Sequence, residues 1–121
     1  MATARYLVHD VDAAVGFYTG LLAFELKQQF GPAMEVLALD DFEFWLAGPN
    51  ASAQRPMPDG SRPEPGGWNR IVVKVDDIAA TVEALRAEGV GFRNDVISGP
   101  GGQQVLISDP SGNVVELFQP S

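Results

Sequence analysis

The 121-residue sequence has no cysteine, one histidine and only eight lysines and arginines. The lack of cysteine excludes disulfides, thiolate chemistry and every metal site built on sulfur ligands. Sixteen acidic residues give a formal charge of −8, which argues against nucleic acids and membranes as partners. No apolar run approaches membrane-spanning length, and the first residues lack a secretion-signal pattern. We therefore expect a cytoplasmic protein of one domain.

One segment of the chain occurs twice. Residues 8–15, VHDVDAAV, return as residues 75–82, VDDIAATV, and aligning Asp10 with Asp77 gives a shift of 67 residues (77 − 10). Apolar residues follow each aspartate at the spacing of one helical face, and aspartate is a favoured residue at a helix N-cap. The repeat predicts two copies of one structural module.

Each copy is predicted to be a βαβββ module. Module one covers residues 1–47, a Pro- and Gly-rich linker loop covers residues 48–68, and module two covers residues 69–121. An open sheet with one helix leaves its second face uncovered. We therefore expect an α+β fold in which the two tandem modules form open, curved mixed sheets around a shared cleft. The expected strands are residues 4–8, 24–30, 35–39, 42–47, 70–75, 92–97, 103–108 and 114–119, and the expected helices are residues 11–22 and 78–88.

Strand alternation predicts which side chains face the cleft, because neighbours in a strand point to opposite faces. The predicted wall mixes apolar and charged residues, and its basic side chains serve either a ligand, an acidic partner such as Glu43, or solvent. Arg70 and Glu116 are expected near the centre of one half, where a mutual ion pair and ligand contact are both open. Trp45 and Phe118 serve either packing or recognition. The predicted ligand-binding residues are Arg5, Leu7, Trp45, Arg70, Val72, Lys74, Leu106, Glu116 and Phe118.

Three segments carry a family resemblance. Residues 17–24, FYTGLLAF, are similar to an FY…LLGF segment, with Ala23 in place of the usual glycine. Residues 75–78, VDDI, are similar to the start of a second module, and residues 109–118, DPSGNVVELF, to a closing DP-x-GN-xx-EL motif. Together they resemble the vicinal oxygen chelate superfamily, also called the glyoxalase/bleomycin-resistance/dioxygenase superfamily. The resemblance covers nearly the whole chain except residues 48–68, and it implies the fold predicted above.

The resemblance also implies where a metal would be bound. Enzymes of this superfamily typically hold a divalent metal with His, Gln or Glu from the first and last strands of each module. The corresponding positions here are Thr3, Trp45, Arg70 and Glu116. Only the last is a metal-ligating residue type, and Arg70 would repel a cation, so we expect neither a metal nor another cofactor. His9 lies six residues beyond Thr3, about 20 Å along an extended strand, and is expected at a solvated strand end.

Two classes of function follow from the resemblance. The first is a metal-independent protein that binds a small aromatic or amphipathic molecule in the cleft, as in the bleomycin-resistance branch. The alternative is an enzyme of the same superfamily. It would be either a metal-dependent lyase, isomerase or dioxygenase, or a metal-free enzyme with Glu116 as general base and Arg70 as the group that stabilises an enolate or carboxylate. A regulatory domain that binds a partner protein is a third option, without a specific signal. Open sheet edges also favour a homodimer.

Overall fold

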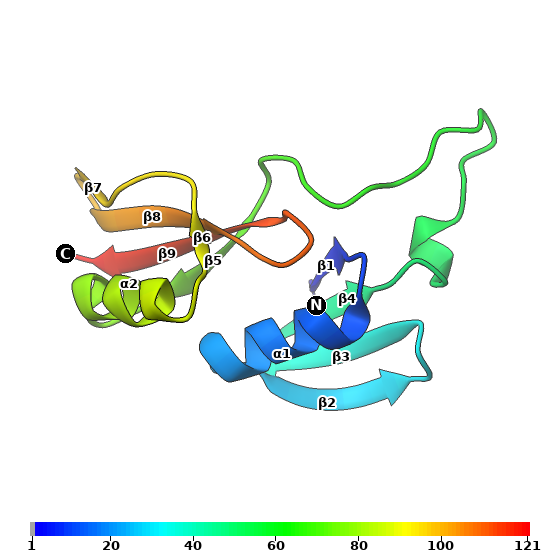
Figure 1. The fold of residues 1–121 in the computed structure, drawn as a ribbon, viewed down its shortest axis with the longest axis horizontal. Helices are drawn as coiled ribbons and strands as arrows, with labels where there is room; N and C mark the ends of the chain where they lie inside the picture. The colour runs from blue at the N-terminus through cyan, green and yellow to red at the C-terminus, as the bar shows by residue number, and fades with distance from the viewer. Residues whose placement is uncertain (1) are drawn as a thin grey trace. The chain divides into compact units, whose positions relative to one another are not determined.

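A computed structural model describes residues 2–121 and divides the chain into two compact units, which separate between Gly66 and Gly67. Each unit contains one α-helix and one mixed sheet (Figure 1). Among the described residues, the first sheet has four strands and the second has five. This confirms the predicted α+β fold of two βαβββ modules. None of the helices in residues 2–121 is long and apolar enough to cross a membrane.

The first unit is a four-stranded sheet with α1 on one face (Figure 1). The strand order is β1-β4-β3-β2, and β1 is parallel to β4 whereas the other neighbours are antiparallel. The helix begins after Asp10, whose Oδ1 accepts the Ala13 N–H at 3.1 Å, as expected for an N-cap. The elements are β1 (Ala4–Leu7), α1 (Val11–Leu21), β2 (Glu25–Phe30), β3 (Met34–Leu39), β4 (Phe42–Ala47) and a 3-10 turn (Ser52–Gln54).

Aromatic side chains form the core between α1 and this sheet. Tyr18 from α1 and Phe44 from β4 are fully buried, with ring centroids 4.9 Å apart. Tyr6 and Phe24 also contact Phe44, with centroid distances of 4.8 and 5.5 Å. The edge-to-face contacts of Phe44 with Tyr18 and Tyr6 add to the stabilisation from apolar burial. Tyr6 and Phe44, from β1 and β4, therefore lie on the face of the sheet that the helix covers.

The second unit repeats this plan. Its sheet has the order β5-β9-β8-β6, with β5 parallel to β9, and β7 also pairs with β8. Asp77 caps α2 through the Ala80 N–H at 3.1 Å, the same bond that Asp10 makes in the first unit. The duplication therefore extends to the helix caps. The elements are β5 (Ile71–Lys74), α2 (Ile78–Ala87), β6 (Gly91–Phe92), β7 (Ile97–Gly99), β8 (Gly102–Ser108) and β9 (Val114–Pro120).

The continuous strand predicted over residues 92–97 is wrong, because the structure has two short strands, β6 and β7, in its place. The backbone N–H of Arg93 still donates to the Leu106 carbonyl at 2.9 Å. At the next position the side chain of Asn94 replaces the backbone, since its Oδ1 accepts the Leu106 N–H at 2.9 Å. A side-chain acceptor satisfies the β8 donor and allows the main chain to leave the sheet.

The Pro- and Gly-rich segment bonds to the first unit through the Gly48 N–H, which donates to the Ala33 carbonyl at 2.8 Å, and through one side chain. Nε2 of Gln54, in the short 3-10 turn, donates to the carbonyl oxygens of Val8 and Ala47, both at 3.0 Å. These carbonyls lie where β1 and β4 end, and that of Ala47 also accepts the Val8 N–H at 2.9 Å, so Gln54 adds a side-chain donor where this strand pair ends.

Candidate functional site

The face of the second sheet opposite α2 carries an ion pair. Nε and Nη2 of Arg70 lie 3.0 and 2.9 Å from Oε1 of Glu116. The Glu116 side chain is 10% exposed and that of Arg70 is 31% exposed, so the carboxylate is the more enclosed partner. Nη1 of Arg70 also donates to the carbonyl of Trp68 at 3.3 Å. Of the two arrangements open from the sequence, the structure contains the ion pair, and ligand contact by these residues stays a prediction.

Apolar side chains flank this ion pair. The strand register places Val72 and Leu106 on either side of Glu116 in one row. In the next row, Lys74 and Gln104 lie on either side of Phe118. Val72 is 51% exposed, which is high for a valine within a strand. The predicted residues of module two are therefore brought together on one face, with a buried charge between apolar neighbours.

Sequence reasoning missed a second cationic contact in this unit. The Arg93 guanidinium lies over the Trp68 ring, 5.3 Å from its centroid. Its Nε and Nη2 donate to Ser108 Oγ and to the Gly112 carbonyl, both at 2.9 Å. Trp68 is 67% exposed and lies in a segment without apolar periodicity. The only signal in the sequence was a large aromatic residue in that segment, and nothing local indicates its partner.

The face of the first sheet opposite α1 presents Trp45. Arg5 and Trp45 are register partners in β1 and β4, and the Arg5 guanidinium lies 5.0 Å from the centre of the indole. The indole Nε1 donates to Glu43 Oε1 at 3.2 Å. Leu7 lies two residues further along β1, opposite Ala47, and therefore on the same face. These contacts fix the orientation of a partly exposed aromatic ring.

The four positions that correspond to metal ligands do not fit a divalent cation. Thr3 is exposed, and the indole N–H of Trp45 is a donor with no lone pair to offer a metal. Glu116 is the one metal-ligating residue type among them, and its Oε1 already accepts a hydrogen bond from Arg70 Nε and lies 2.9 Å from Arg70 Nη2. Among residues 2–121 there is no group of three or more His, Cys, Asp or Glu side chains that could hold a metal ion. His9 is exposed between the end of β1 and the cap of α1, as expected.

The sequence matches the family model described as Glyoxalase/Bleomycin resistance protein/Dioxygenase superfamily over residues 1–117. The chain belongs to this superfamily. A comparison with curated proteins gives no match. Among solved structures of similar fold, a lactoylglutathione lyase from Agrobacterium tumefaciens is 21% identical, with a TM-score of 0.76 and coverage of 98% of this chain and 92% of that one.

Two further solved structures of the same fold are of an antibiotic binding protein and of an antibiotic resistance protein. TnmS3, an antibiotic binding protein from Streptomyces sp. CB03234, is 26% identical, with a TM-score of 0.71 and coverage of 100% of this chain and 97% of that one. The fosfomycin resistance protein FosX from Listeria monocytogenes is 12% identical, with a TM-score of 0.75 and coverage of 100% and 93%. Superfamily membership therefore fixes the fold, and the activity has to be argued from the residues of the site.

Proposed function

We propose that this superfamily member is a metal-independent binding protein for a small aromatic or amphipathic molecule. The observation that carries the proposal is the ion pair between Arg70 and Glu116. A metal at this carboxylate would have to displace the guanidinium and would then lie beside a fixed positive charge, which is unfavourable in a partly buried site. The Glu116 carboxylate is therefore better placed to bond with Arg70, or with a polar group of a ligand, than to coordinate a metal.

The remaining residues suit an aromatic ligand. Trp45 presents a ring whose orientation is set by Arg5 and Glu43, and a flat ligand can stack on such a ring with little loss of side-chain entropy. In the second unit, Val72 and Leu106 provide apolar surface beside the polar pair. Sites for small molecules usually combine apolar walls with a few polar groups that orient the ligand.

The similarity to TnmS3 supports the same class of function. That protein is described as an antibiotic binding protein, and the likeness extends over the full length of this chain. We infer that the present chain likewise binds its ligand, and that it holds the ligand without transforming it.

Tryptophan fluorescence tests the proposal directly, because the chain has only two tryptophans. Trp68→Phe leaves Trp45 as the only emitter, and Trp45→Phe is the matched control that leaves Trp68. Titration with planar aromatic antibiotics is expected to quench Trp45 saturably, with a Kd on the order of micromolar. The absence of saturable quenching and of any ligand-dependent rise in Tm across the panel would count against binding.

A metal-free enzyme is the second candidate, and the same ion pair favours it. A carboxylate enclosed beside a guanidinium can act as a base while the cation stabilises developing negative charge. Product analysis after incubation with a bound ligand separates the two functions. Turnover that is lost in Glu116→Gln would establish the enzyme, whereas recovery of unchanged ligand from the wild-type complex supports sequestration.

Two further predictions accompany the proposed function. We propose a homodimer, which sedimentation equilibrium would test. A cytoplasmic location also stays a prediction, which fractionation of the source cells would test.

A further inference from the structure

Glu35 is a buried carboxylate on the helix-covered side of the first sheet. It is 4% exposed, and its Oε1 accepts one hydrogen bond, from Gln29 Nε2 at 2.9 Å. Its Oε2 is buried and has no hydrogen-bond partner, the one such side-chain atom within residues 2–121. An ionisable group buried with an unsatisfied oxygen is costly to fold, so it requires a reason.

The second unit shows that the fold does not need a carboxylate at this position. In the first sheet, Tyr6 aligns with Leu46, which aligns with Glu35. In the second sheet, Val73 aligns with Leu117, which aligns with Val105. Tyr6 and Val73 are separated by 67 residues (73 − 6), the shift of the repeat, so Glu35 and Val105 are equivalent. Val105 is fully buried, and it fills in the second unit the place that Glu35 takes in the first.

The start of the helix also differs between the units. Gln119 follows β9 residue Phe118, and its Oε1 accepts the first N–H of α2, that of Ile78, at 2.7 Å. The equivalent residue in the first unit is Gly48, which has no side chain to cover the start of α1. A Cβ at Gly48 would lie 2.5 Å from Cγ2 of Val11, so the close packing of the helix requires glycine.

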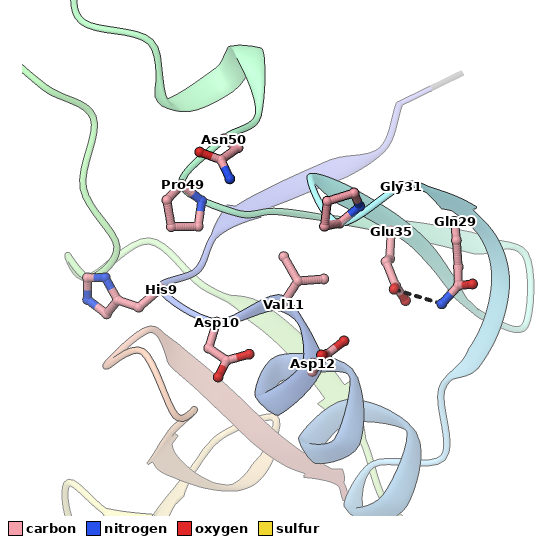
Figure 2. A pocket seen from close by; sticks show the side chains of 10 residues that line it. His9, Asp10, Val11, Asp12, Gln29, Gly31, Glu35, Pro49 and Asn50 are labelled. Atoms are coloured by element: carbon pink, nitrogen blue, oxygen red, sulfur yellow. Dashed lines mark hydrogen bonds between the residues drawn. The ribbon is translucent and has the colours of Figure 1, made fainter.

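The cavity lies at the start of α1 and has a volume of about 440 Å³ (Figure 2). Figure 2 shows Glu35 and Gln29 at one end and His9 at the other, with Val11 between them. Asp10 and Asp12 contribute two more carboxylates, and the lining residues include no lysine or arginine. The cavity is therefore acidic and much larger than a single metal ion requires.

We propose that this cavity binds a small organic cation with N–H donors, such as a primary ammonium or a guanidinium group, and that Glu35 is its anionic partner. A charged N–H donor satisfies a carboxylate with stronger hydrogen bonds than a neutral donor does. The volume leaves room for a short organic chain, and Asp12 adds attraction at the rim. The site lies on the other face of the sheet from Trp45. Trp45 is the register partner of Val36, and Val36 and Glu35 are consecutive in β3, so their side chains point to opposite faces.

Amide NMR titrations with butylammonium and butylguanidinium test this site. Either probe is expected to give saturable shifts at Val11, Asp12 and Glu35. Glu35→Val copies the residue that the second unit uses, and Glu35→Gln keeps the shape without the charge. Binding is expected to weaken by about 10-fold or more in both variants, because a charge-assisted hydrogen bond is lost. The matched control is Asp41→Asn, at an exposed carboxylate in the β3–β4 turn, which should leave binding unchanged.

Tetramethylammonium distinguishes the proposed site from general attraction to acidic surface, since it has the charge but no N–H donor. The proposal requires that it bind at least about 10-fold more weakly than butylammonium. Shifts that do not saturate for either N–H probe, equal binding by tetramethylammonium, or unchanged affinity in Glu35→Val would each overturn it. Loss of the folded state in both Glu35 variants would also overturn it, because the carboxylate would then have a structural role.

Discussion

Replacing Arg70 by alanine should destabilise the protein by leaving the Glu116 carboxylate unpaired. The substitution removes two donors, at 3.0 and 2.9 Å, from a side chain that is only 10% exposed. A charged hydrogen bond contributes about 1.5–3 kcal/mol. Because the Arg70 side chain is 31% exposed, water can partly replace it, and we expect a loss of about 1–2 kcal/mol. For a chain of this length that corresponds to a decrease in Tm of about 3–8 °C.

Urea denaturation of a double-mutant cycle measures this contribution. The cycle consists of Arg70→Ala, Glu116→Gln and the double variant. Lys74→Ala is the control, because Lys74 is an exposed cation on the same face, paired in register with Phe118 rather than with Glu116. We expect the double variant to be more stable than the sum of the single losses predicts, with a coupling free energy of about 1 kcal/mol. If Arg70→Ala costs no more than Lys74→Ala and the coupling free energy is zero, the ion pair does not stabilise the fold.

Substitutions at three further positions test the fold. Gly48→Ala should cost about 1–3 kcal/mol, because its Cβ would lie 2.5 Å from Val11 Cγ2, and an unchanged urea midpoint would contradict this packing. Ala23→Gly should stabilise the protein by about 0.5–1 kcal/mol, because Ala23 has a φ of 64° in the left-handed region, and a lower Tm would oppose that argument. Asp77→Ala should cost about 1 kcal/mol in thermal unfolding, because the α2 cap is lost. Asp77→Asn keeps a side-chain oxygen and should retain most of the stability. Equal losses in both variants would show that the cap does not act through this oxygen.

The parts of the fold that depend on local signals were predictable. Asp10 and Asp77 occupy the caps expected of them, because a helix cap is decided by the residues within one turn. Strand alternation also placed Arg5 and Trp45 on one face of the sheet, where their side chains contact each other. The predicted strand over residues 92–97 failed because its course depends on the bond from Leu106 to Asn94, and no local pattern encodes that contact.

The candidate site was predictable only in part for the same reason. The spacing of the repeat placed Arg70 at the first strand and Glu116 in the last strand of module two, and these two strands are neighbours in the sheet. Arg70 lies just before β5, two residues from the register partner of Glu116, and the two side chains form the ion pair. Trp68 and Arg93 contact each other from two irregular segments, so strand alternation could not predict this contact. Glu35 was placed in a strand, but the cavity beside it is also lined by Pro49 and Asn50, which follow β4. Their position beside Glu35 arises only in the folded chain.

Calorimetric titration of the metal-stripped protein tests the central claim of metal-independent binding most directly. The ligand would be the planar aromatic antibiotic that quenches Trp45 most strongly, added in the presence of EDTA and, separately, of excess Mn²⁺. Metal-independent binding predicts one saturable isotherm with the same Kd under both conditions. Binding that disappears in EDTA and returns with Mn²⁺ would contradict it.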